Sequence, residues 1–269
     1  MMIYFDGGSH VYGSELSDPS TQSMAAHLGT MYNATVVNQA LEDSSNNQIL
    51  QRTQSLISQC KQNNAWPDLI VIGFTEWHKE DWFVDGSYCS SNSLKSQYPE
   101  QFGSQRQKYY IDYLSKNSDF IGAMSKYYNN VIYNLHTELF YFGVPHLFFN
   151  CALSLRCDRE MITFDWAEFY LKPYQITFNY CNWCRYQGYN EITPGKFHYG
   201  SDANRAWAEL LYNHIQQHNL LTKDEYGSLH NLGRQRRRHH GPGVGEWDEE
   251  LLRPPHSRGQ NGKLQNHKM

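Results

Sequence analysis

The chain has 269 residues, of which 40% are hydrophobic, 15% aromatic and 19% charged, with a formal net charge of −4. This composition excludes a wholly disordered chain, and the length allows one large domain or two small ones. Residues 223–269 carry nine Lys or Arg against six Asp or Glu, so the preceding part holds 14 against 21. An acidic body does not favour nucleic acid as the main ligand, because binding phosphates requires a basic face.

The apolar pattern alternates between short strand-like runs and helix-like segments, which is typical of a parallel α/β domain. We expect strands at residues 2–5, 35–38, 68–74, 144–150 and, less clearly, 175–179. We expect helices at residues 23–32, 46–63 and 201–218, and two helices within 107–142 that are broken near 116–119. The run at 68–74 is apolar throughout, as in a central strand buried on both faces. The pattern therefore predicts a three-layer α/β/α domain with a central parallel sheet of flavodoxin-like strand order.

The domain is expected to span residues 1–222, with insertions at about 78–105 and 151–195. After it, residues 223–269 read as a disordered charged tail, because its Arg, Gly and Pro residues cannot pack a core. The arginine run at 234–240 is either a solvated segment, which we favour, or a patch that contacts nucleic acid. Nucleic acid is thus expected as a partner only through the tail.

No segment is typical of a leader or a membrane helix. The N-terminus has no basic start with a long apolar run, and no stretch reaches the ~20 apolar residues of a span. We therefore expect a cytoplasmic protein with reduced thiols and no membrane partner. Cys181 and Cys184 have the spacing of a zinc pair, but one pair cannot complete a tetrahedral site. We expect no metal and no cofactor.

Ser9 follows the first strand through a glycine-rich turn, at the edge where open parallel sheets place their ligands. Other polar segments follow later strands or precede the last helix, at residues 37–46, 73–76 and 197–207. In a doubly wound sheet these segments converge on one rim, where a histidine such as His198 can take a serine proton. Taken singly, Ser9 is explained by a turn, His198 by a helix start and Asn46 by a helix cap.

The order of these segments resembles the blocks of the SGNH (GDSL-type) hydrolase superfamily of esterases and lipases. The opening FDGGSHVYGSEL at residues 5–16 is similar to SGNH-like proteins of bacteriophages. Residues 38–49, 67–75 and 198–215 resemble the second, third and last blocks. The resemblance extends over residues 1–218 but is specific only within the blocks. It implies that Ser9 is the nucleophile and His198 the base, and that the protein works in a host cytoplasm or a virion.

The signature residues of that superfamily are retained only in part. The residue before the serine is usually Asp and is Gly8 here, while the oxyanion glycine falls at Asp43 and the asparagine near Thr75. The resemblance implies an oxyanion site formed by the N–H of Ser9, the amide near Asp43, and Thr75.

The acid expected three residues before the histidine falls at Gly195. A backbone carbonyl, Glu191 or Asp202 could take its place beside His198, and the sequence does not choose among them.

The first hypothesis is a serine esterase that hydrolyses an acyl ester of a small molecule or a carbohydrate. Asn46, Glu76 and Trp77 are further candidates for lining the site, and an aromatic insertion with Trp82, Phe83 and Tyr88 could contact a sugar. The alternative is a catalytically inactive binding or virion-associated module on the same fold, which the departures favour. A third hypothesis, a flavodoxin-like nucleotide binder, is weakened because no Lys or Arg lies near the first turn.

Overall fold

The computed structural model describes residues 1–77, 79, 81–84, 87–90, 118–155, 166 and 168–221. Its contacts divide the chain into one compact unit, Met1–His230, and a second, Asn231–Met269. The expected tail at 223–269 lies outside the described residues, and so does most of the insertion at 78–105. The boundary at residue 222 therefore stays a prediction. Among the described helices, none is long and apolar enough to cross a membrane.

A parallel sheet forms the centre of the first unit, with strand order β2-β1-β3-β6. The strands are β1 (Met2–Gly7), β2 (Thr35–Asn38), β3 (Leu69–Phe74) and β6 (His146–Asn150). All three neighbouring pairs are parallel. A single parallel bridge between Phe148 and Tyr170 continues the sheet beyond β6. With β1 between β2 and β3, this is the flavodoxin-like order.

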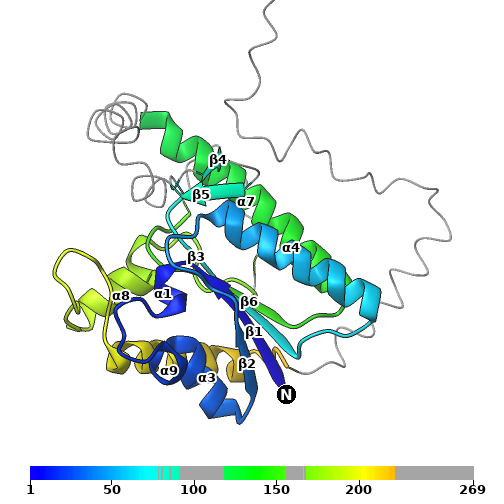
Figure 1. Ribbon diagram of the computed structural model, residues 1–269, viewed down its shortest axis with the longest axis horizontal. Helices are drawn as coiled ribbons and strands as arrows, with labels where there is room; N and C mark the ends of the chain where they lie inside the picture. Colours follow the sequence, from blue (N-terminus) through cyan, green and yellow to red (C-terminus); the bar gives the residue numbers. More distant parts are fainter. Residues whose placement is uncertain are drawn as a thin grey trace, which may run out of the picture. The chain divides into compact units, whose positions relative to one another are not determined.

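Helices cover both faces of the sheet (Figure 1). One face carries α4 (Asn46–Asn63) and α7 (Ser118–Tyr141), and the other carries α3 (Met24–Tyr32) and α9 (Ser201–Gln217). The remaining elements are α1 (Ser9–Tyr12), α2 (Pro19–Gln22), a hairpin of β4 (Asp81–Val84) and β5 (Ser87–Ser90), the 3₁₀ helix η1 (Ile176–Phe178) and α8 (Tyr180–Tyr186). The predicted three-layer α/β/α class is confirmed.

The alternation of side chains along β1 assigns its two faces. Ile3 and Phe5 pack into the core beneath α3 and α9, whereas Tyr4 joins the core beneath α4 and α7. Successive strand residues point to opposite faces, so Asp6 belongs to the face of Tyr4. A charged side chain thus occupies a core position of the α4 face, and it is fully buried there.

Most predicted elements agree with the structure to within a few residues, with two differences. Residues 176–178 form the 3₁₀ helix η1, so the strand expected at 175–179 is wrong. Of the two helices expected within 107–142, the second is observed as α7 from Ser118, and the first, at 107–117, lies outside the described residues. The strand expectation rested on a short mixed run, which periodicity alone cannot assign.

Candidate active site

Three loops meet at the carboxyl edge of the sheet, around the turn between β1 and α1. A Cβ added to Gly8 would lie 3.4 Å from the Ser44 carbonyl oxygen and 3.5 Å from Thr75 Cβ. One added to Gly7 would lie 2.4 Å from Val11 Cγ2, so the start of α1 approaches the strand too closely for a side chain. The loops after β1, β2 and β3 therefore converge as the sequence predicts.

Ser9 is the first residue of α1 and is partly buried. The preceding Gly8 is the N-cap, and its carbonyl accepts the N–H groups of Val11 and Tyr12, both at 3.0 Å. The N–H of Ser9 belongs to the first turn, where amides have no acceptor within the helix. Such an amide is suited to donate to an anion beside the Ser9 hydroxyl.

His198 comes from the far end of the described chain to the same place. Its ring packs edge-on against His10, the residue after Ser9, with ring centroids 5.2 Å apart. Its Nδ1 lies 3.6 Å from Glu15 Oε2, is shielded from solvent and has no hydrogen-bond partner in the described chain. No hydrogen bond joins the Ser9 hydroxyl to the His198 ring among these residues. His198 thus packs against the residue next to Ser9, without a hydrogen bond to Ser9 itself.

His10, between Ser9 and the core residue Val11 in the chain, packs against both His198 and Tyr180. Its Nε2 lies 3.5 Å from Cys181 Sγ, and its side chain is buried. Burial lowers the pKa of His10 to about 4, although the Glu76 carboxylate opposes that shift. His10 is therefore neutral at pH 7 and adds no positive charge next to His198.

Asn46 joins the second loop to the third. Its Oδ1 accepts the N–H of Thr75 at 2.8 Å, and its Nδ2 donates to the carbonyls of Thr75 and Glu76 at 3.2 and 3.3 Å. The expected capping role belongs instead to Ser45, whose hydroxyl accepts from Gln48 in a capping box. Asn46 therefore positions the loop after β3 and is fully buried in doing so.

The Thr75 hydroxyl, expected as an oxyanion donor, has another partner, and the Asp43 side chain is paired with a cation. The Thr75 hydroxyl donates to the Glu76 carboxylate. Burial alone would raise the pKa of Glu76, but this hydrogen bond and the nearby positive charge of Lys79 help to hold it below its ordinary value. Asp43 adopts a left-handed φ of 56° and its Oδ1 lies 3.5 Å from Lys79 Nζ. Its negative charge is thus matched by a cation.

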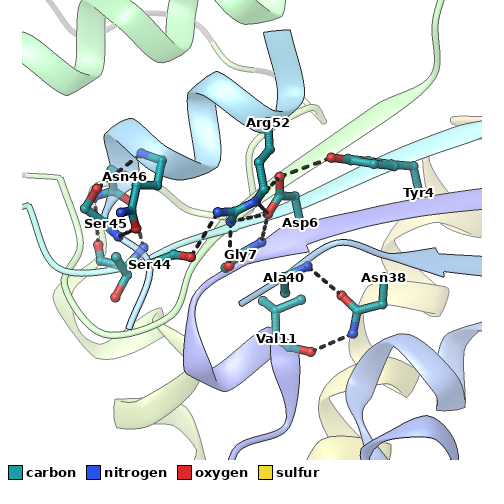
Figure 2. A network of polar contacts seen from close by, with 12 residues as sticks. Tyr4, Asp6, Gly7, Val11, Asn38, Ala40, Ser44, Ser45, Asn46 and Arg52 are labelled. Carbon is teal, nitrogen blue, oxygen red and sulfur yellow. Dashed lines mark hydrogen bonds and ion pairs between the residues drawn. The ribbon is translucent and has the colours of Figure 1, made fainter. Parts of the chain in front are cut away.

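A buried ion pair between Asp6 and Arg52 links these loops (Figure 2), and the sequence did not predict it. Arg52 of α4 contacts the Asp6 carboxylate through Nη2 at 2.6 Å and through Nε at 3.1 and 3.2 Å. The same guanidinium donates to the Ser44 hydroxyl at 3.0 Å and to the Gly7 carbonyl at 3.1 Å. Burial raises the pKa of Asp6 to about 6, against the opposing effect of Arg52. Asp6 is still ionised at pH 7.

A second polar contact holds α1 from the side of β2 (Figure 2). Asn38, the last residue of β2, donates to the Val11 carbonyl at 3.2 Å and accepts the N–H of Ala40 at 3.1 Å. The short helix that begins with Ser9 is therefore held from two strands. Its position depends on side chains of the scaffold, which is a requirement for a precise site.

Trp77 lies in the hydrophobic core instead of lining the site. It is 1% exposed, packs against Phe74 and Tyr128, and donates from Nε1 to the Ser154 carbonyl at 3.1 Å. Trp82 and Phe83 fall on β4 and Tyr88 on β5, a hairpin whose side chains lie outside the description. No described ring from that insertion lines the site.

The cysteines expected to be ordinary thiols are buried and free: Cys60, Cys151, Cys181 and Cys184. Burial raises the pKa of Cys181 and of Cys184, so both are protonated at pH 7. Among the described residues, no group of three or more His, Cys, Asp or Glu side chains could hold a metal ion.

A cleft of about 800 Å³ lies beside β2 and α4, next to the second loop. It is lined by Val37, Leu41, Asp43, Ser44, Arg52 and neighbouring glutamines. Neither Ser9 nor His198 contributes to this cleft, so it adjoins the candidate site through Asp43 and Ser44 without containing it.

Comparison with known proteins adds little to this geometry. No protein-family model matches the chain, and no curated protein matches it significantly. Among solved structures it is similar to a chain described as a lipolytic protein of the G-D-S-L family from Desulfitobacterium hafniense DCB-2. The identity is 12% and the TM-score 0.33, over 79% of this chain and 98% of that one. The fold class is therefore assigned from the structure of this protein alone. It is a three-layer α/β/α domain with polar loops at the carboxyl edge of the sheet.

Proposed function

We propose that this protein is a serine hydrolase of SGNH type that cleaves acyl esters. The observation that carries the proposal is the placement of His198, which packs against the residue after Ser9 and directs Nδ1 at a carboxylate. An imidazole whose Nδ1 faces an acid leaves Nε2 to act as base on a serine. The site lies at the carboxyl edge of the sheet, where open α/β domains bind their ligands.

In the proposed reaction, Ser9 Oγ attacks the ester carbonyl carbon while His198 Nε2 takes the hydroxyl proton. The N–H of Ser9 donates to the oxyanion. Collapse of the tetrahedral intermediate breaks the ester C–O bond, and His198 returns the proton to the departing alkoxide. Water then attacks the acyl-enzyme, His198 takes its proton, and the carboxylic acid leaves as Ser9 regains its hydrogen. The Ser9–His198 contact is expected to tighten when substrate binds, as catalytic contacts often do.

We further propose a small-molecule or carbohydrate ester as substrate. Tyr12 on α1 and Phe197 beside His198 are 37% and 43% exposed. Exposed aromatic faces next to a nucleophile and a base are suited to contact an acyl chain or the apolar face of a sugar. The charge of Asp43 does not oppose an oxyanion strongly, because Lys79 partly neutralises it.

The test is labelling with a fluorophosphonate probe, compared in the intact protein, Ser9→Ala and His198→Ala. We expect label in the intact protein and none in either variant, because the probe reacts only with an activated serine. Ser58→Ala and His218→Ala are matched controls: Ser58 is an exposed residue of α4, and His218 follows α9. Both controls should label like the intact protein.

The alternative, an inactive binding module on this fold, is favoured by one arrangement. The Thr75 hydroxyl already donates to Glu76, so it is not offered to an oxyanion. A folded protein that takes no label and leaves aryl esters intact would overturn the hydrolase proposal in favour of this module.

A further inference from the structure

The two acidic side chains that the sequence offers as partners for His198 both have other contacts. Glu191 accepts from the N–H of Gly195 at 2.5 Å and from that of Phe197 at 3.4 Å, so it closes the loop that carries the histidine. Asp202 accepts from the N–H of Ala203 at 2.9 Å, in the first turn of α9. Both candidates from the sequence are thus engaged with backbone amides.

Glu15 instead faces the imidazole. Its Oε2 lies 3.6 Å from His198 Nδ1, and the two side chains are 27% and 17% exposed. The Nδ1 atom is shielded from solvent and has no hydrogen-bond partner within the described chain. A buried ring nitrogen left without a partner requires an explanation, and the nearest carboxylate oxygen is a few tenths of an ångström beyond a hydrogen bond.

The backbone around Glu15 is held in an uncommon conformation. Gly13 ends α1 with a φ of 91°, and Glu15 has a left-handed φ of 68°, which is unfavourable for a residue with a side chain. The N–H groups of Gly13 and Ser14 both donate to the Ser9 carbonyl at 3.0 Å. The chain therefore reverses directly after the nucleophile helix. Such local strain is often retained where it positions a functional side chain.

We propose that Glu15 is the positioning residue for His198, an acid supplied by the loop after the nucleophile in place of one before the histidine. This proposal rests on the hydrolase function proposed above. Glu15 accepts a hydrogen from Nδ1, which fixes the tautomer with an unprotonated Nε2 facing Ser9. Its negative charge then stabilises the imidazolium that forms when Ser9 loses its proton.

Other charged groups near His198 do not take this role. His10 packs against the ring, and Glu76 and Lys79 act on His10. Arg185 lies 3.7 Å from Glu191 and over the Phe197 ring. Glu15 is thus the one carboxylate within ion-pair distance of the His198 ring among the described residues.

The test compares Glu15→Gln and Glu15→Asp with Glu191→Gln and Asp202→Asn as matched controls. The first readout is the tautomer of His198, from the ¹⁵N chemical shifts of its ring in the labelled protein. We expect Nδ1–H in the intact protein and in Glu15→Asp, and a mixed tautomer in Glu15→Gln. The controls should keep the Nδ1–H tautomer. This readout does not require catalysis, so it distinguishes failure of this proposal from failure of the hydrolase function.

The second readout is the rate of fluorophosphonate labelling against pH. Glu15→Gln should slow labelling by roughly 10²- to 10⁴-fold, as loss of an orienting acid does in serine triads. Glu15→Asp should recover most of the rate. An unchanged tautomer and rate in Glu15→Gln, or a larger loss in Glu191→Gln, would overturn the proposal.

Discussion

Replacing Arg52 with methionine tests whether the buried ion pair holds the candidate site together. Asp6 is fully buried, and the guanidinium that compensates it is 21% exposed. Removing one partner of such a pair leaves an uncompensated buried charge, which destabilises proteins by about 3–5 kcal/mol. We expect Arg52→Met to lower the free energy of unfolding by that amount at pH 8, measured by urea denaturation with Trp fluorescence. Total stabilities are typically ~5–15 kcal/mol, so the effect is large.

The double variant Asp6→Asn/Arg52→Met separates lost charge compensation from lost packing. It should be more stable than Arg52→Met, because no buried charge remains. Without Arg52, only the hydrogen bonds from Gly7 and Tyr4 still oppose the effect of burial on the Asp6 carboxyl, so its folded pKa rises further above the unfolded value. The folded state then binds more protons, and the deficit of Arg52→Met should shrink as the pH falls from 8 toward 5.

A matched control lies on the same helix. Lys61→Met removes an ion pair with Glu138 in which Lys61 is 40% and Glu138 11% exposed, and it should lower stability by less than Arg52→Met because the cation keeps contact with solvent. Two results would contradict this expectation. One is a loss of unfolding free energy in Arg52→Met no larger than in Lys61→Met, and the other is a double variant less stable than Arg52→Met.

Three further perturbations follow from the structure. Asn46→Ala should lower the free energy of unfolding by roughly 2–3 kcal/mol and slow fluorophosphonate labelling. The reason is that it leaves buried backbone groups of the loop after β3 unpaired. Unchanged urea denaturation would contradict the positioning role of Asn46. Gly7→Ala should destabilise by ~1–3 kcal/mol through overlap with Val11, and Val11→Ala should recover part of that loss in the double variant. Lowering the pH from 7 to 5 should destabilise the intact protein, because burial lowers the pKa of His136 to about 4 and of His146 to about 3. His136→Phe should weaken this pH dependence, since it removes one of the two groups.

The sign of the pH effect follows from where protons bind. His136, His146 and His10 have folded pKa values below the unfolded value of about 6.5, so the unfolded state binds more protons as the pH falls. Each can therefore lower stability by up to ~2 kcal/mol at pH 5. Asp6, with a folded pKa of about 6, acts in the opposite direction below pH 6 and offsets part of the loss. A urea midpoint that is equal or higher at pH 5 would contradict the account.

The elements of the sheet could be predicted because burial on both faces leaves a continuous apolar run, as in β3. Parallel strands place their carboxyl ends on one edge, so convergence of the loops containing Ser9 and Asn46 also followed from the pattern. The 3₁₀ helix η1 was missed because short mixed runs have no decisive period.

The partners within the site could not be predicted. Asp6 and Arg52 are separated by 46 residues, and only alternation along β1 indicated that Asp6 faces the helix layer. Glu15 reaches His198 because its backbone is left-handed, a conformation that residue type alone does not reveal. The sequence therefore predicted which loops converge, while the side-chain pairing within them depended on tertiary packing.

Peptide mapping by mass spectrometry after saturation with fluorophosphonate tests whether Ser9 is an activated nucleophile. We expect one phosphonyl adduct per chain, on the peptide containing Ser9, with none formed in His198→Ala. An adduct on another serine, or an unmodified Ser9 peptide from the folded protein, would contradict the proposed role of Ser9.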